Sequence, residues 1–215
     1  MPSDWSNSGT FSGILNGSGK TIKVETKNGI FYDFTGTVKN VSITMPNGTN
    51  SQRGALGYRA KTGATVKDTF IKVSSNIGDN GGAIIGVVLN DLTIDNVVVN
   101  ATMSYNASRG IIAGFGNNSK TAKVTATNLY IISKVGLMGN LSSYARPLTI
   151  NGTLIDSDDD KNLTGEITSI TGINVYKTVD DFKTFYGTGY TNLTEFLQSQ
   201  CESVLGCAKE SASSN

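Results

Sequence analysis

A segment that recurs at a nearly constant spacing constrains this chain more than any other feature of its sequence. Each copy starts with threonine, carries Asn or Asp near its centre and places apolar residues at alternating positions. The first threonines of successive copies lie 28, 28 and 32 residues apart. Repeats of this length are typical of solenoids, in which each repeat is one structural unit. The four copies are Thr37–Ile43, Thr65–Ile71, Thr93–Val99 and Thr125–Ile131.

A second element, in which glycine is followed by apolar residues, precedes each copy. The distance from this glycine to the following threonine varies from copy to copy, so insertions fall in the connection between the two elements, as is common in solenoids. Glycine at this place favours a tight bend. The elements begin at Gly29, Gly54, Gly82 and Gly110, and a fifth is predicted at Gly136.

Alternating apolar positions predict short strands that cannot bury their apolar side alone. Stacking the repeats in register would pair each strand with its equivalents, about 4.8 Å away. The column Ile43, Ile71, Val99 and Ile131 would then lie inside. The polar residues at the centre of each copy would form a ladder at a corner, where short polar side chains satisfy turn backbone. This ladder is predicted to contain Asn40, Asp68, Asn96 and Asn128.

The glycine and threonine elements, with the opening segment Phe11–Ile22, resemble GLUG-type repeats and, more broadly, the pectate-lyase-like right-handed β-helix. The resemblance covers roughly residues 10–155. It implies an all-β fold, a right-handed parallel β-helix (solenoid), which we assign to residues 1–177.

The end of the chain predicts a helix that caps the solenoid over residues 178–208. Asn192–Glu195 is typical of a capping box, and the apolar residues that follow it keep a helical period. Gly206 suits the position after the helix end, where the chain turns back, so a disulfide between Cys201 and Cys207 is sterically reasonable. Free thiols remain the alternative. Residues 209–215 are predicted to be a disordered tail.

Composition and charge exclude several functional classes. The chain has no histidine, which disfavours Ser-His-Asp and Cys-His catalysis. Its 18 basic and 17 acidic residues form no long block of one sign, so nucleic acid is not an expected partner. No apolar stretch is long enough to insert into a membrane. The first residues lack the features of a secretory signal, so either a signal has been removed or the chain is assembled in the cytosol.

Few residues suggest catalysis or metal binding. The carboxylates of residues 156–160 could ligate calcium, but the segment lacks the glycine and distal glutamate of an EF-hand loop, so we predict a solvated turn. A carbohydrate-cleaving enzyme would need Asp68, Asp95 and either Arg53 or Arg109 to converge in a groove. Ordinary corner roles explain these residues more simply. We therefore predict no catalytic residue, metal or cofactor.

Ten Asn-x-Ser/Thr sequons occur, more than the composition leads us to expect. Either they are glycosylated or they reflect the polar residues that turns need. Asn40 belongs to the predicted ladder and should be unmodified. The candidates in the most loop-like surroundings are Asn47, Asn106, Asn117 and Asn151.

These features favour a non-enzymatic structural or adhesive component of an external surface or virus particle, whose faces contact neighbouring protein subunits or surface glycans. By family resemblance, similar repeats occur in bacterial surface adhesins, and β-helices also serve in virus particles. The alternative is a polysaccharide-cleaving enzyme of the pectate-lyase-like class. Ice binding ranks third, because the threonine column supplies one hydroxyl per coil and a flat ice-binding face needs at least a pair.

Overall fold

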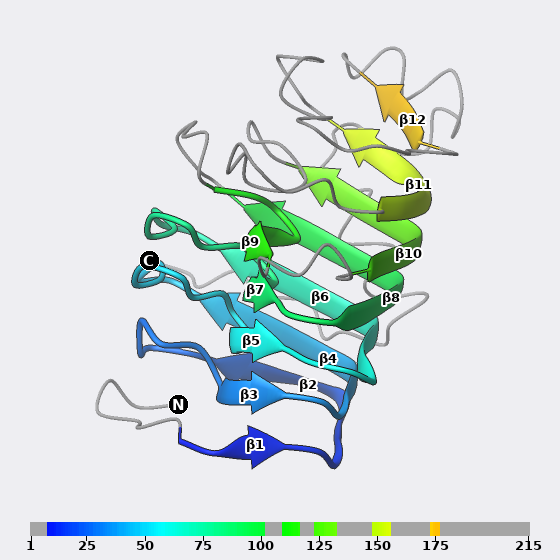
Figure 1. Ribbon diagram of the computed structural model, residues 1–215. Helices are drawn as coiled ribbons and strands as arrows, with labels where there is room; N and C mark the ends of the chain where they lie inside the picture. Colours follow the sequence, from blue (N-terminus) through cyan, green and yellow to red (C-terminus); the bar gives the residue numbers. More distant parts are fainter. Residues whose placement is uncertain (1–7, 102–108, 117–122, 133–147, 156–172, 177–215) are drawn as a thin grey trace.

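In the computed structural model of the protein, the described residues are 8–101, 109–116, 123–132, 148–155 and 173–176. They form two sheets in which all neighbouring strands are parallel, and the first ten strands alternate along the chain between the sheets. Figure 1 shows the strands piled one above another from β1 to β12. The predicted parallel solenoid is thus confirmed at this level, and two facing antiparallel layers are excluded for the described part of the chain.

The first sheet, which we call the short-strand sheet, has the order β1-β3-β5-β7-β9. Four of its strands have four residues each, and they follow the glycine-containing bends of the repeat. Its strands are β1 (Thr10–Phe11), β3 (Phe31–Phe34), β5 (Gly57–Ala60), β7 (Ile85–Val88) and β9 (Ala113–Gly116).

The second sheet, the long-strand sheet, has the order β12-β11-β10-β8-β6-β4-β2. Six of these strands have eight to eleven residues, and four of the six contain the threonine element of the repeat. They are β2 (Ile14–Lys23), β4 (Thr37–Met45), β6 (Ala64–Val73), β8 (Asp91–Ala101), β10 (Lys123–Ile132), β11 (Leu148–Ile155) and β12 (Ile173–Tyr176).

The pairing of the long strands follows the sequence repeat residue by residue. Thr37 pairs with Thr65, Thr65 with Thr93, and Thr93 with Thr125. The column of Ile43, Ile71, Val99 and Ile131 is formed in the same way. In the other element, Gly82 and Gly110 form a parallel bridge. The period seen in the sequence is therefore the period of the stack.

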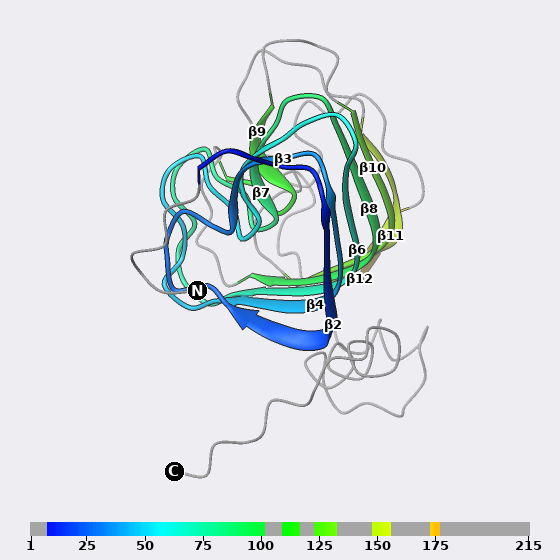
Figure 2. The ribbon, with the colours of Figure 1, turned by 90° about the horizontal axis from the view of Figure 1, so that it is seen from below.

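The long strands turn a corner at the polar residue in the middle of the repeat. Asn40, Asp68 and Asn96 have positive φ angles of 51°, 45° and 53°. Asn and Asp tolerate this left-handed conformation better than most residues because their side chains bond locally. Figure 2, which looks along the stack, shows the long strands bending so that one sheet covers two sides of the interior.

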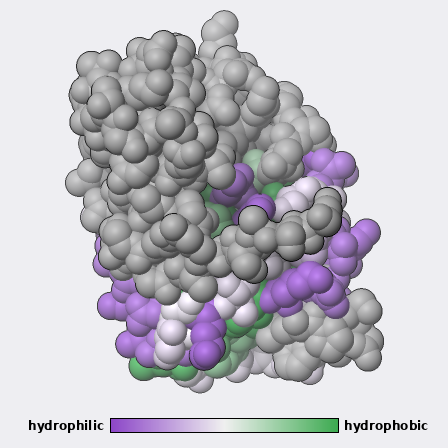
Figure 3. Space-filling model, turned by 180° about the vertical axis from the view of Figure 1, so that it is seen from behind, coloured by the Kyte–Doolittle hydropathy of each residue, from purple (hydrophilic) through white to green (hydrophobic). Residues whose placement is uncertain are grey.

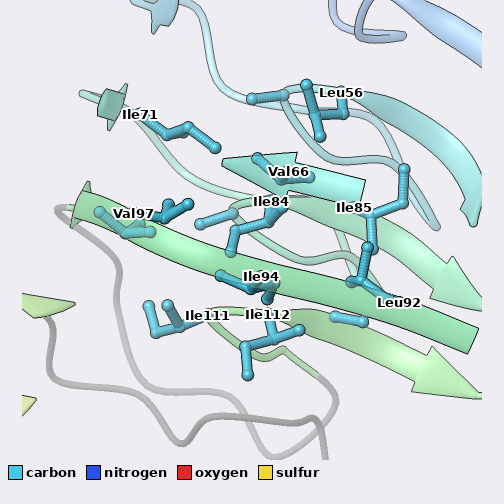
Figure 4. Packing of buried hydrophobic residues seen from close by; sticks show 14 of the residues in the cluster. Leu56, Val66, Ile71, Ile84, Ile85, Leu92, Ile94, Val97, Ile111 and Ile112 are labelled. Carbon is cyan, nitrogen blue, oxygen red and sulfur yellow. The ribbon is translucent and has the colours of Figure 1, made fainter. Parts of the chain in front are cut away.

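A continuous apolar core fills the space between the sheets. The inward positions of the long strands form columns such as Val38, Val66 and Ile94, each fully buried. They pack against residues of the bends before the short strands, among them Ile84 and Ile111 (Figure 4). Each buried aliphatic side chain of this kind stabilises the fold by about 1.5–3 kcal/mol.

The end of the stack that carries β1 and β2 differs from its middle. Three rings, those of Phe11, Phe31 and Phe34, stack there with centroids 4.4 to 6.3 Å apart. Ile14 of β2 is 68% exposed. Figure 3 shows green apolar surface at this lower end of the molecule, with purple polar residues along the flanks. The interior of the solenoid thus reaches the surface of the described residues at this end.

One expectation was wrong in detail. Asn151, placed by the sequence in loop-like surroundings, lies within β11, where it pairs with Thr127. The sequence repeat had not identified this strand, because β11 has no residue opposite Asn128, so the polar corner residue is missing from it. Asparagine followed by glycine is typical of turns, and here the pairing with β10 and β12 overrides that preference.

The predicted helix 178–208 and the predicted tail 209–215 lie outside the described residues. Within those residues, no helix has the length and apolar character needed to cross a membrane.

Candidate functional site

The charged and aromatic side chains best suited to bind a ligand gather on the short-strand sheet, at β3 and β5. They comprise two tyrosine rings, two guanidinium groups, an ammonium group, a carboxylate and an amide. Two strands and the segments beside β5 supply them. We call this set the arginine–tyrosine cluster; it consists of Tyr32, Asp33, Gln52, Arg53, Tyr58, Arg59 and Lys61.

Strand pairing brings the cluster together. Asp33 of β3 pairs directly with Arg59 of β5, and Tyr32 and Tyr58 occupy the positions just before them. The two tyrosine rings meet edge to face, with centroids 5.3 Å apart and an interplanar angle of 70°. Because the strands are parallel and in register, residues about 26 positions apart become immediate neighbours.

Asp33 is the anionic centre of the cluster and is only 6% exposed. Arg59 donates two hydrogen bonds to it, from Nε to Oδ1 at 2.6 Å and from Nη2 to Oδ2 at 3.0 Å. Lys61 Nζ donates to Oδ2 at 2.6 Å. Burial alone would raise the pKa of Asp33, but these hydrogen bonds and charges outweigh burial and hold that pKa below its usual value. The carboxylate therefore stays ionised.

Arg53 and Arg59 lie over the tyrosine rings. The Cζ atom of Arg53 is 4.3 Å from the centroid of Tyr58 and 5.2 Å from that of Tyr32. Arg59 lies 5.1 Å from the centroid of Tyr58 and 5.0 Å from that of Tyr32. Contacts of this kind stabilise a cation by about 0.5–1 kcal/mol at exposed sites and more when water is excluded. The rings therefore hold two like charges close together.

Arg53 lacks the ion pair that Arg59 has. Among the described residues, its buried Nη1 atom has no hydrogen-bond partner. Burial lowers the pKa of Arg53, and the neighbouring Arg59 acts in the same direction. The cluster has three cations, Arg53, Arg59 and Lys61, and one anion, Asp33, which gives a net charge of 3 − 1 = +2. It is therefore a site with excess positive charge and with one buried donor that no acceptor satisfies.

The cluster ends sharply along the stack. The positions that carry Tyr32 and Tyr58 in β3 and β5 are Gly86 in β7 and Gly114 in β9. A Cβ atom on Gly86 would lie 1.9 Å from the backbone oxygen of Gln52, so the segment before β5 packs directly against β7. No side chain fits at that position.

The corner at which the polar ladder is predicted carries two hydrogen bonds between neighbouring strands. Asn96 Nδ2 donates to Asp68 Oδ1 at 2.9 Å, across neighbouring strands. Asn40 Nδ2 donates instead to Asn16 of β2, at 3.2 Å to Oδ1. The position of Asn128 in β10 matches theirs, but its side chain lies outside the description. Such bonds tie one coil to the next at the bend.

The residues that a carbohydrate-cleaving enzyme would need are not brought together by any described contact. Asp95 is exposed and pairs with Lys67, while Asp68 binds Asn96. Arg53 lies on the tyrosine rings, and Arg109 Nη2 binds Asp79 at 3.0 Å. Arg53 and Arg109 belong to equivalent bends two coils apart, with Gly81 in the bend between them.

Asn47 is the one glycosylation candidate that lies in a described turn. It is exposed, and its Nδ2 donates to the backbone oxygen of Glu25 at 3.0 Å. Thr49 of the same sequon is buried and accepts a hydrogen bond from the backbone of Gly78. Asn106, Asn117, Cys201, Cys207 and residues 156–160 lie outside the described residues. The described part of the chain contains no group of acidic, Cys or His residues able to hold a metal.

Of the residues in the cluster, only Arg53 was a candidate from the sequence. The signal was present: Tyr32-Asp33 and Tyr58-Arg59 stand at matching places in successive coils, with opposite charges side by side. It was missed because the strands that carry them are short and their other positions do not repeat.

Comparisons with known proteins add no relative. No protein-family model matches the chain, and no curated protein or solved structure is detectably similar to it. The resemblance to GLUG repeats therefore remains a hypothesis, and functional arguments depend on the geometry above.

Proposed function

We propose that this protein is a non-enzymatic structural or adhesive component of an external surface or a virus particle, and that its lateral faces contact neighbouring proteins or glycans. The observation that carries the proposal is the uninterrupted parallel stack. Its core residues are fully buried, and every described coil is bonded to the next. A frame of this kind holds outward side chains at fixed spacing along extended faces, which suits repeated or broad contacts.

The arginine–tyrosine cluster supports a contact role in a second way. Tyrosine and arginine are the residue types enriched at the energetic centres of protein interfaces. Here they are half-buried and already held in one arrangement by Asp33 and by each other. Little conformational entropy would be lost when a partner binds them.

Finer features of the fold belong to the same proposal. We infer that the solenoid is right-handed, as in the pectate-lyase-like β-helices it resembles, that its coils are GLUG-like, and that residues 178–208 form the helical cap. A cap of this kind would prevent the sheet edges from pairing end to end.

Fractionation of the source material tests the proposal. An antibody against the chain should detect it in purified particles or in the cell-surface fraction, and native mass measurement should find it bound to other subunits or glycans. If the protein is instead a monomer in the soluble fraction, and binds no particle, surface or glycan, the proposal is wrong. Release of fragments from a panel of acidic and neutral polysaccharides would establish the enzyme alternative.

A further inference from the structure

We infer that the arginine–tyrosine cluster is a docking site for a carboxylate side chain, Asp or Glu, of a protein partner. The inference rests on the proposed function and gives it a definite contact: an acidic segment of a neighbouring protein, bound over β3 and β5.

Charge selects an anion. The cluster has a net charge of +2 (three cations and one carboxylate), and Arg53 is the cation without an acidic partner among the contacts of the described residues. Its Nη1 atom has lost contact with water without gaining an acceptor. Leaving a charged donor in this state is unfavourable, and an anion nearby would offset the cost.

The donors still available suit a carboxylate. Arg59 uses two N–H groups on Asp33, and Lys61 Nζ makes one hydrogen bond to the same residue. Both groups carry further N–H donors. Their side chains are 29% and 34% exposed, so a ligand can reach them from solvent. Arginine in particular binds planar carboxylates through paired hydrogen bonds.

The tyrosine rings favour a peptide over an acidic sugar. Guanidinium groups lie over both rings, 4.3 to 5.2 Å from the ring centroids, so these ring faces are not open for a sugar ring to stack on. What remains available is mainly N–H donors and charge. Such a surface matches the short carboxylate side chains of a protein partner.

The site is small because the cluster spans only two coils. Beyond it, Gly86 and Gly114 replace the tyrosines, and the buried Val87 replaces Asp33 and Arg59. Since neighbouring strands are about 4.8 Å apart, the cluster accommodates one or two carboxylates rather than a long acidic tract.

Binding of defined probes to the purified full-length protein tests the inference. The probes are a fluorescent peptide of alternating glutamate and serine, the same peptide with glutamine for glutamate, and a hyaluronan hexasaccharide as the acidic sugar. Fluorescence anisotropy measures the affinity of the peptides, and competition measures that of the sugar. We expect the glutamate peptide to bind at least about tenfold more tightly than the glutamine peptide, the value of one charged hydrogen bond.

Two lysines provide a matched pair of variants. Lys61→Gln removes a cation of the cluster, and Lys67→Gln removes the same charge from the long-strand sheet. Lys61→Gln should weaken binding of the glutamate peptide about fivefold to tenfold, whereas Lys67→Gln should change it less than about twofold. Arg53→Gln should weaken it by at least about tenfold. Circular dichroism and urea unfolding check that each variant folds. If Arg53→Gln does not fold, the comparison of Lys61→Gln with Lys67→Gln is the test.

Three outcomes would overturn the inference: equal binding of the two peptides, equal weakening by Lys61→Gln and Lys67→Gln, or tighter binding of hyaluronan that is lost in Arg53→Gln. The last would assign the cluster to an acidic sugar. These results are independent of the fractionation experiment. A chain found on particles that shows no preference for the glutamate peptide would retain the proposed function and lose only this site.

Discussion

The two sheets of the solenoid use the same repeat in different ways. In the long-strand sheet, equivalent positions carry similar residues from coil to coil, such as the threonines that begin at Thr37 or the aliphatic column that contains Ile71. In the short-strand sheet the backbone pairs just as regularly, but equivalent positions change from Tyr58 to Gly86 and from Arg59 to Val87.

The difference separates the part of the molecule that specifies the stack from the part that can specialise. Columns of similar side chains fix the register, since a shift of one residue would move apolar groups to the surface. Four-residue strands contribute less to register and can differ from one coil to the next. The arginine–tyrosine cluster lies on the sheet whose residues differ from coil to coil.

The largest loss of stability is expected when β7 is given a side chain at Gly86, the position that carries Tyr58 in β5. Gly86→Ala places a Cβ atom 1.9 Å from the backbone oxygen of Gln52, and neither backbone segment can move without breaking its pairing. We expect the free energy of unfolding to fall by more than about 3 kcal/mol, measured by urea denaturation.

Gly13→Ala is the matched control, because a Cβ atom there would meet only the ring of Phe11, at 3.6 Å. This substitution should lower the free energy of unfolding by less than about 1 kcal/mol. Equal stability of the two variants would show that Gly86 is not required by close packing.

The second test removes the anion of the cluster. Asp33→Asn deletes the charge that Arg59 and Lys61 share, which we expect to lower the free energy of unfolding by about 2 kcal/mol at neutral pH. The effect stays moderate because both cations are partly exposed, and water screens part of the interaction.

The difference in stability between wild type and Asp33→Asn should depend on pH. Because the pKa of Asp33 is lowered in the folded protein, its charge stabilises the fold above the unfolded value of about 4. That contribution is lost as the pH falls through the lower, folded value. The difference in urea midpoint between wild type and Asp33→Asn should therefore shrink below about pH 4. A difference that stays constant at acidic pH would contradict the ion-pair explanation.

A smaller effect is expected at the corner of the long-strand sheet. Asn96→Ala loses the hydrogen bond to Asp68 and places alanine at a φ of 53°, whereas Asn96→Gly loses only the bond. Thermal unfolding should find the alanine variant less stable than wild type by about 1–2 kcal/mol, and the glycine variant between the two. If alanine is the more stable substitution, conformation at the corner is not what the residue provides.

The smallest effect is expected at Thr69, a polar residue in a column of valines. It is fully buried between Val41 and Val97, and its hydroxyl donates to the backbone oxygen of Lys67 at 2.7 Å. Thr69→Val loses this bond but makes the column fully apolar. The free energy of unfolding, measured with urea, should therefore change by less than about 1 kcal/mol. A loss above about 2 kcal/mol would mean that the hydroxyl is structurally required.

The same contrast explains what could be predicted from the sequence. The stack, its parallel pairing and the register around Thr65 were predictable because like residues recur at one spacing. β11 was not, since it lies only 24 residues after β10 by their paired threonines, Thr125 and Thr149, and lacks the polar corner residue. The cluster was missed for a different physical reason: Asp33 and Arg59 are complementary rather than alike, and similarity does not reveal complementary neighbours.

Because equivalent residues of successive coils pair, as Thr65 does with Thr93 after 28 residues, the molecule can change in length by whole coils. A tandem duplication of one such segment inserts a coil whose upper and lower surfaces already fit its neighbours. The length of the stack then grows in steps of about 4.8 Å, with no redesign of the interior. The length of the stack is therefore set by the number of coils, and the outward side chains of each coil can change after the duplication.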